Sequence, residues 1–252
     1  MKSIIITGAS SGLGREYFLA CHRIFPDARF YLVARRADRL AETAALCADA
    51  DCRLVECDLT SDEGKKSFSE LLRADKPNVL MLINNAGYGK LGCVAELSPE
   101  AQEGMVELNC ASLTRLTAEV IPYMERGSSI INVSSIASFA PTPRMTVYSS
   151  TKAYVSAFSK GLREELKPKK IGVLAVCPGP MRTEFLGVAE ITDENSSAFR
   201  NLPYSHAPDV AYKSVKAAIR GKGFYTPGGL YKLYRVLAKL LPHSLVMKLS
   251  KC

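Results

Sequence analysis

Short apolar runs alternate with longer amphipathic stretches along most of the chain. The short runs are rich in branched side chains and almost continuously apolar, which is typical of strands that are buried on both faces. The longer stretches repeat apolar side chains every three or four positions, as helices that cover a sheet do. The pattern predicts strands at Ser3–Thr7, Arg29–Ala34, Cys52–Glu56, Val79–Ile83, Ser129–Ser134, Gly172–Cys177 and Phe224–Thr226. It predicts helices at roughly Leu13–Phe25, Ala37–Ala48, Ser61–Ala74, Pro99–Arg126, Val147–Lys167 and Pro208–Arg220.

This alternation of strand and helix indicates an α/β fold built on a doubly wound parallel sheet of about seven strands, with helices on both faces. No repeat, low-complexity tract or linker divides the 252 residues, so we expect a single domain over residues 1–252. In open sheets of this kind, ligands bind at the carboxyl ends of the strands. Most of the motifs described below directly follow a predicted strand and should lie at that edge.

A glycine-rich turn, Thr7-Gly8-Ala9-Ser10-Ser11-Gly12-Leu13-Gly14, joins the first predicted strand to the first predicted helix. Glycines at this point let the backbone turn tightly and come close to a pyrophosphate, whose charge is met by amide groups at the helix N-terminus. A glycine-rich loop by itself is weak evidence for nucleotide binding. This one has the strand before it and the helix after it that the mechanism requires, which favours a dinucleotide site, although its spacing is Gly-xxx-Gly-x-Gly and not the usual dinucleotide fingerprint.

Two arginines, Arg35 and Arg36, follow the second predicted strand. An acidic residue at this point would bind the ribose hydroxyls of NAD, and none is present. The Arg35 guanidinium can pair with a 2′-phosphate instead, so the sequence predicts NADP in preference to NAD. The alternative interpretation is that both arginines are solvated residues at the start of a helix.

Ser135, Tyr148 and Lys152 carry the candidate chemistry. Tyr148 and Lys152 are four positions apart in a predicted helix and should share one of its faces, which brings an ammonium beside a phenol. We expect this charge to lower the pKa of Tyr148 toward the working pH, as a general acid/base requires. Ser135 ends a strand-like run, where its hydroxyl can polarise a substrate oxygen. Taken alone, a tyrosine in an apolar helix is usually a core residue.

Three further motifs follow predicted strands. Asp58-Leu59 comes after the third strand, Asn84-Asn85-Ala86-Gly87 after the fourth, and Pro178-Gly179-Pro180-Met181-Arg182-Thr183 after the sixth. Small residues and amides suit a wall pressed against a cofactor, although Asn-Asn-Ala-Gly in isolation is only a turn signal. Two prolines about a glycine fix a bend, and Thr183 can donate a hydrogen bond to a carboxamide.

With these motifs in this order, the chain resembles the short-chain dehydrogenase/reductase family, in the single-domain form with a Rossmann-type sheet. The resemblance covers Lys2 to about Thr183. It implies that Tyr148 is the general acid/base, that Lys152 binds the nicotinamide ribose and lowers the tyrosine pKa, and that Ser135 holds the substrate oxygen. Asn109, inside a long predicted helix, matches the family's relay asparagine. The resemblance also implies which residues bind each part of the cofactor. The pyrophosphate is bound by Gly8, Ser10, Ser11, Gly12, Leu13 and Gly14, and the adenine by Asp58 and Leu59. The ribose lies against Asn85, Ala86 and Gly87, and the nicotinamide is bound by Met181 and Thr183, beside the Pro178-Gly179 bend.

Two segments lie beyond these motifs. Residues 184–208 form a connection longer than most, and we expect them to act as a substrate lid. Residues 230–251 carry an apolar stripe beside a basic face, broken at Pro242. This segment can rest on an anionic membrane, cover the site or form a dimer contact, and a helix packed on its own domain is the plainest interpretation.

The net charge of +8 and the pI near 9.0 fit a nucleic acid, a membrane surface or a phosphorylated cofactor as partner, or a merely soluble basic surface. No basic patch interleaved with aromatic residues is present, so we expect no nucleic-acid partner. Eight cysteines without a C-x-x-C pair are typical of thiols in a reducing compartment, and we expect no metal site. We find no signal peptide and no long apolar run, so the expected location is cytoplasmic.

The predicted function is hydride transfer between NADP(H), with NADPH preferred over NADH, and the carbonyl or secondary alcohol group of an apolar small molecule. The predicted pocket walls are Tyr88, Ile136, Phe139, Met145 and Phe185. Many members of the family close with Asp-Gly-Gly, where this chain has Pro227-Gly228-Gly229, so we expect a homodimer instead of their tetramer. The alternative function is a non-catalytic NADP(H)-binding regulatory or scaffold protein, which would have no need of a tuned acid.

Overall fold

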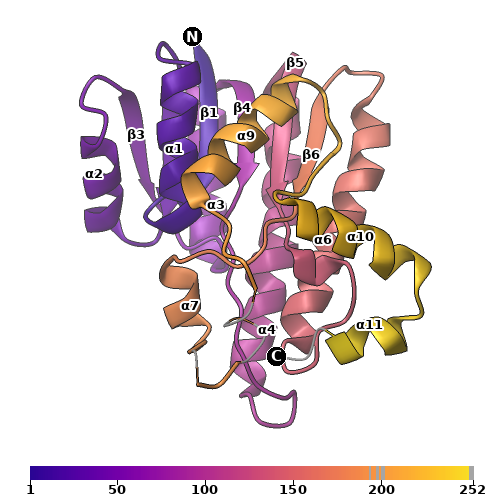
Figure 1. Cartoon of the computed structure of the whole chain (residues 1–252). Coiled ribbons are helices and arrows are strands. Elements are labelled where there is room, and N and C mark those ends of the chain that lie inside the picture. The colour runs from indigo at the N-terminus through magenta and orange to yellow at the C-terminus, as the bar shows by residue number, and fades with distance from the viewer. Residues whose placement is uncertain (193, 197–198, 200–201, 250–252) are drawn as a thin grey trace.

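Seven parallel strands form the centre of the computed structural model, which describes residues 1–192, 194–196, 199 and 202–249, with 248 and 249 described by their backbone (Figure 1). The order of the strands across the sheet is β3-β2-β1-β4-β5-β6-β7, and each neighbouring pair runs parallel. The strands are β1 (Lys2–Thr7), β2 (Arg29–Ala34), β3 (Asp51–Glu56), β4 (Asn78–Asn84), β5 (Met124–Val133), β6 (Gly172–Val176) and β7 (Phe224–Tyr225).

Helices cover both faces of this sheet. Side chains of α1, α2 and α9 pack on one face, and those of α3, α5 and α6 pack on the other. Figure 1 shows α1 and α9 in front of the sheet. None of the helices in the described ranges combines the length and the apolar character needed to cross a membrane. The helices are α1 (Gly12–Ile24), α2 (Ala37–Ala45), α3 (Asp62–Asp75), α4 (Pro99–Val106), α5 (Leu113–Val120), α6 (Thr146–Leu166), α7 (Glu184–Val188), α9 (Ala207–Ile219), α10 (Gly229–Leu240) and α11 (His243–Leu249).

The central strand β1 explains why the strands are almost wholly apolar. Successive side chains of a strand point to opposite faces, so Ile4 and Ile6 pack among the residues of α1 and α9 while Ile5 packs among those of α3 and α6. All three are fully buried. A strand covered on both faces has no solvent side on which to place polar residues, which confirms the predicted two-sided sheet.

The order of the strands also fixes the position of the ligand site. The chain builds the sheet outward from β1 toward β3, then returns to the other side of β1 with β4. The loops after β1 and β4 therefore leave the sheet in opposite directions, and a crevice opens between them at the carboxyl edge. The motifs predicted from the sequence follow β1, β2, β3, β4, β5 and β6 at this edge.

The region predicted as one helix, Pro99–Arg126, is divided in the structure. Between α4 and α5 lies a π-helical turn, Glu107–Ser112, and after α5 comes a short 3-10 turn, Ile121–Tyr123. Pro122 has no amide hydrogen with which to continue the helix. Strand β5 begins at Met124, five residues before the predicted start, because Met124 already pairs with Val79 of β4; the pairing shifts register before it continues at Ser129.

Candidate active site

The turn between β1 and α1 requires glycine at three positions. Gly8 and Gly12 have positive φ angles of 65° and 49°, which other residues rarely adopt. A β-carbon on Gly14 would overlap the carbonyl oxygen of Gly8 and lie 2.7 Å from the side-chain amide nitrogen of Asn85. No side chain caps the N-terminus of α1, so its first amide groups remain available to an anion. The turn therefore fits the pyrophosphate of a dinucleotide.

Thr7 and Asn85 tie this turn to the end of β4. The Thr7 hydroxyl accepts hydrogen bonds from the backbone amides of Asn85 and Ala86, both at 3.0 Å. In return the Asn85 side-chain amide donates to the carbonyl oxygens of Thr7, at 3.0 Å, and Gly8, at 3.3 Å. Asn85 thus joins two loops through its side chain, while Ala86 and Gly87 present a flat wall. Sequence reasoning missed Thr7, although a polar residue that closes an otherwise apolar strand is a usable signal.

Ser135, Tyr148 and Lys152 come together where β5 ends and α6 begins. Tyr148 and Lys152 lie on the same face of α6 and are both buried, with the Lys152 Nζ atom 5.7 Å from the centre of the Tyr148 ring. The Nζ atom donates a hydrogen bond of 2.9 Å to the carbonyl oxygen of Val133, the last residue of β5. The Ser135 hydroxyl accepts from the Ala137 amide at 3.1 Å, which fixes the serine at the strand end.

The pKa of Tyr148 differs from the one expected from the sequence. Burial raises the pKa of Tyr148 to about 12, and hydrogen bonding with the Ser135 side chain offsets only part of the rise. Burial also lowers the pKa of Lys152 to about 8. The sequence predicted a lowered tyrosine pKa, whereas in the chain by itself the pKa is raised, and burial is the largest cause. At neutral pH, Tyr148 is a phenol that holds its proton.

Asn109 lies in the π-helical turn Glu107–Ser112, a rare backbone form that is frequent at functional sites. Its side chain is buried and donates to the Tyr88 carbonyl at 2.9 Å and to the Thr151 hydroxyl at 3.0 Å, while its oxygen accepts from the Tyr88 amide at 3.1 Å. A β-carbon on Gly87 would lie 2.7 Å from this oxygen and 3.3 Å from Lys152 Nζ. Asn109 therefore lies directly behind Gly87, close to Lys152, and does not itself line the cavity.

Arg35 and Arg36 take different positions at the end of β2. The Arg36 guanidinium donates to the Glu184 carboxylate at 2.7 Å, which links the start of α2 to the start of α7. Arg35 lines the cavity, is exposed and has no ion-pair partner in the described part of the chain. Of the two, Arg35 has the guanidinium that is available to a phosphate.

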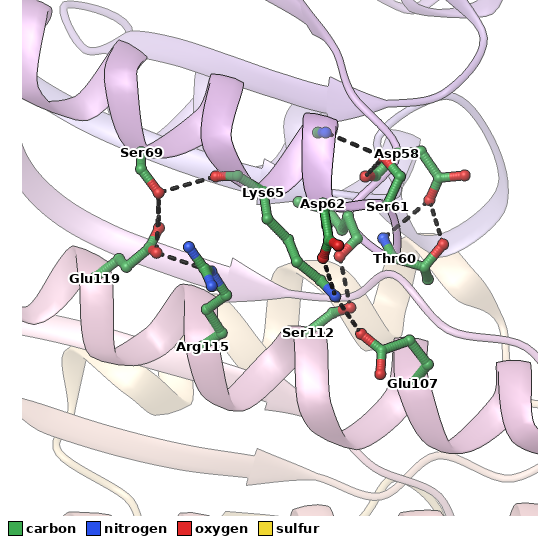
Figure 2. Close-up of polar contacts among 12 residues, drawn as sticks. Asp58, Thr60, Ser61, Asp62, Lys65, Ser69, Glu107, Ser112, Arg115 and Glu119 are labelled. Atoms are coloured by element: carbon green, nitrogen blue, oxygen red, sulfur yellow. Dashed lines mark hydrogen bonds and ion pairs between the residues drawn. The ribbon is translucent and has the colours of Figure 1, made fainter.

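A polar network holds the loop after β3, as Figure 2 shows. The Asp58 carboxylate accepts from the Thr60 amide at 2.9 Å and from the Thr60 hydroxyl at 2.6 Å. Partial burial opposes ionisation of Asp58, but these bonds and the charge of Arg35 outweigh it and lower its pKa. The Ser112 hydroxyl donates to the Leu59 carbonyl at 2.7 Å, so the same loop is bonded to the π-helical turn that carries Asn109.

One cavity of about 1030 Å³ runs along the carboxyl edge of the sheet. It passes from the glycine-rich turn, past Ser135 and Tyr148, to a chamber with mainly apolar walls. The predicted site residues that line it are Gly8, Ser10, Ser11, Gly12, Leu13, Arg35, Arg36, Asp58, Leu59, Asn85, Ala86, Gly87, Ser135, Tyr148, Lys152, Pro178, Gly179, Met181 and Thr183. Gly14 and Asn109 do not line it and support it from behind.

A comparison with protein families decides the relationship. The family described as short chain dehydrogenase matches residues 2–194, well over half of the chain. The chain belongs to the short-chain dehydrogenase family. An uncharacterized oxidoreductase of Staphylococcus saprophyticus is 31% identical over 191 residues, which are 74% of this chain and 81% of that protein.

Two solved structures resemble this short-chain dehydrogenase. A short-chain dehydrogenase from Sphingobium yanoikuyae in complex with NADPH has a TM-score of 0.81 and 30% identity, covering 95% of this chain and 93% of that one. The bulky-bulky ketone specific alcohol dehydrogenase from Comamonas testosteroni has a TM-score of 0.76 and 28% identity, covering 95% and 92%. These likenesses confirm the predicted fold and the prediction that the chain is an oxidoreductase of this family.

Helix α10 of this short-chain dehydrogenase, which lies beyond the matched residues, closes one side of the cavity. The Tyr231 ring packs so tightly on Gly179 that a β-carbon there would overlap it, and its hydroxyl donates to the Pro203 carbonyl. Leu230, Tyr231 and Tyr234 line the cavity. The first part of the segment at 230–251 therefore covers the site, one of the interpretations left open by the sequence. Of this segment, residues 250–251 and the side chains at 248 and 249 lie outside the described part.

One of the five predicted wall residues does not line the cavity, and further apolar residues do. Tyr88, Ile136, Met145 and Phe185 line the cavity as expected, and Leu108, Val188, Phe199 and Leu202 were not foreseen. Phe139 does not line it. Its ring instead packs against Tyr234 of α10, 5.9 Å away between ring centres, and against Phe224 of β7, 6.1 Å away. The sequence could not show this because the partners of Phe139 are about ninety residues further along the chain.

Proposed function

We propose that this short-chain dehydrogenase uses NADP(H) to reduce bulky, apolar carbonyl compounds and, in reverse, to oxidise the corresponding alcohols. The observation that carries the proposal is the continuous cavity that joins a dinucleotide-type turn, the Ser135–Tyr148 pair and an apolar chamber. The family relationship supports an NAD(P) cofactor. The relatives bound to NADPH and named for bulky ketones support the finer assignment.

In the proposed mechanism the nicotinamide, when bound, supplies the hydride that reduces the carbonyl carbon. Ser135 and Tyr148 hold the carbonyl oxygen, and Tyr148 transfers its phenolic proton to that oxygen as the carbon–oxygen double bond becomes a single bond. Lys152 binds the nicotinamide ribose and stabilises the phenolate that remains. Asn109 positions the backbone behind Lys152, and Met181 with Thr183 orients the carboxamide.

Residues 184–208 act as the lid in this proposal. The Phe185 ring lies 5.5 Å from the Tyr148 ring between centres, so the start of the segment already covers the reacting group. The Arg36–Glu184 ion pair joins this side of the cavity to the other. Residues 193, 197–198 and 200–201 of the predicted lid lie outside the described part of the chain.

Arg35 should decide the choice of cofactor. Replacing Arg35 with Gln is expected to raise the KM for NADPH by about tenfold or more, because a charged hydrogen bond to the 2′-phosphate is lost, and to leave the KM for NADH nearly unchanged. The measurement is initial rates with both cofactors on a panel of steroid ketones, aryl ketones and β-ketoacyl thioesters. Arg39→Gln is the matched control, since Arg39 is paired with Glu42 and does not line the cavity.

Equal effects of Arg35→Gln on NADPH and NADH would contradict the assigned cofactor preference. Binding of NADPH without turnover of any compound in the panel would favour the alternative of a regulatory binding protein.

The two directions of the reaction should depend differently on pH. Because burial raises the pKa of Tyr148 to about 12, the phenol keeps the proton that reduction needs, and reduction should vary little between about pH 6 and pH 8. Oxidation needs the phenolate, whose fraction grows about tenfold per pH unit below the pKa, so its kcat/KM should rise over the same range. A rate of oxidation independent of pH, with hydride transfer rate-limiting, would refute this role of the raised pKa.

A further inference from the structure

Helix α10 has two apolar sides, and only one of them is packed. Tyr231 and Ala238 are buried against the body of the molecule, and Tyr234 lines the cavity. A second set of apolar residues on α10, which we call the outer stripe, is between 38% and 75% exposed. The outer stripe consists of Leu230, Leu233, Val236, Leu237 and Leu240. Their spacing places them on one continuous side of the helix.

The outer stripe lies at the margin of the molecule and reaches the cavity. Figure 1 shows α10 and α11 projecting at one edge, away from the centre of the sheet. Leu230 belongs both to the outer stripe and to the lining of the cavity, so it stands at the cavity mouth. A surface that covered the stripe would therefore also cover the mouth.

Lysines border the stripe on its other side. Lys232 and Lys239 are exposed and have no ion-pair partner among the described residues. Arg235 points inward, with its guanidinium 5.0 Å from the centre of the Phe224 ring and 3.5 Å from the Thr226 hydroxyl. The exposed part of α10 thus combines leucine and valine side chains with free ammonium groups, which is the composition of a helix that lies in a lipid interface.

The excess positive charge of the chain lies in its last 43 residues, which include most of α9 as well as α10 and α11. After Asp209 the sequence has nine Lys and Arg residues and no Asp or Glu, whereas residues 1–209 have 24 Lys and Arg against 25 Asp and Glu. The net charge of +8 therefore comes entirely from the C-terminal 43 residues. A two-fold contact between copies through the stripe would bring Lys232 and Lys239 of each copy toward those of the other, and like charges would oppose it.

We propose that the outer stripe of α10 docks on the surface of an anionic phospholipid bilayer. The apolar side chains enter the boundary between headgroups and acyl chains, and Lys232 and Lys239 bind lipid phosphates. This inference rests on the surface alone. Its consequence, that an apolar carbonyl compound dissolved in lipid enters the cavity past Leu230, rests on the function proposed above.

Flotation of the full chain with vesicles tests the docking. The wild type should bind vesicles of phosphatidylcholine and phosphatidylglycerol, should not bind vesicles of phosphatidylcholine alone, and should bind more weakly as salt is raised. The double variant Leu233→Ser/Leu240→Ser should lose at least about tenfold in vesicle affinity. The double variant Leu46→Ser/Val94→Ser is the matched control, because it removes two exposed apolar residues elsewhere and should bind like the wild type.

Each outcome has a distinct meaning. Absence of binding by the wild type, or equal binding by the stripe variant and the wild type, would overturn the proposal. A stripe variant that keeps its vesicle binding but changes from dimer to monomer in light scattering would identify the stripe as a contact between copies instead. Thermal unfolding and NADPH affinity, measured on all variants, show that the fold is intact. Turnover of a water-soluble ketone without vesicles tests the proposed function separately.

Discussion

Replacing Tyr148 with Phe is expected to lower kcat/KM for carbonyl reduction by about a thousandfold, since a positioned general acid contributes roughly 10²–10⁴ in rate. The Tyr148 ring packs against Phe185, a contact that phenylalanine keeps, and the hydrogen bond that the phenol loses is the one with Ser135 inside the site. The affinity for NADPH should therefore stay within about twofold, because the loss falls on the chemical step. Initial rates and fluorescence titration of NADPH measure the two quantities.

Tyr154→Phe is the matched control for this variant. Tyr154 lies on the same helix but is exposed, stacks on Phe158 and shares a hydrogen bond of 2.7 Å with the Thr114 hydroxyl. Removing its hydroxyl should leave the rate unchanged. If Tyr148→Phe kept a rate near that of the wild type, Tyr148 would be a core residue and the assigned acid would be wrong.

Replacing Gly14 with Ala should have the largest effect on cofactor binding. The new methyl group would overlap the Gly8 carbonyl and press on Asn85, which together hold the turn against β4. Backbone cannot yield as a flexible side chain can, so we expect about 3 kcal/mol of lost stability, near the upper end for overpacking. We also expect NADPH affinity to fall by at least about a hundredfold, because the turn no longer brings its amides to the pyrophosphate.

Gly161→Ala is the matched control, because Gly161, like Gly14, lies within a helix. Gly161 is in α6, and a β-carbon there meets nothing within 4 Å, so the substitution should be neutral or stabilise the protein by up to about 1 kcal/mol. Denaturant unfolding and NADPH titration of both variants make the comparison. A Gly14→Ala protein that bound NADPH normally would show that the turn does not contact the cofactor.

The sheet could be predicted because its signal is local. Ile4, Ile5 and Ile6 are apolar on consecutive positions, as a strand covered on both faces requires. The start of β5 was missed because residues 125–128 are polar or glycine and form an irregularity between Met124 and Ser129, the two residues there that pair with β4. The π-helical turn at Asn109 has no signal in the pattern, since side chains on such a turn keep nearly helical spacing.

The site residues, like the sheet, could be predicted only where their signal is local. Residues that come directly after strands, such as Arg35 and Ser135, could be placed at the cavity from the sequence. What depends on distant parts of the chain could not, as with the covering of Gly179 by Tyr231. The sequence put Lys152 beside Tyr148 correctly, yet it gave no measure of how deeply both are buried, and burial decides the direction of the tyrosine pKa.

Transfer of a label from the cofactor tests the central claim most directly. The protein would be given NADPH deuterated at the transferable position of the nicotinamide, together with the ketone of the panel that it turns over fastest. Mass spectrometry of the alcohol should show one deuterium on the former carbonyl carbon, with one NADPH consumed per alcohol formed. Consumption of NADPH without labelled alcohol, or no alcohol from any compound of the panel, would contradict the account.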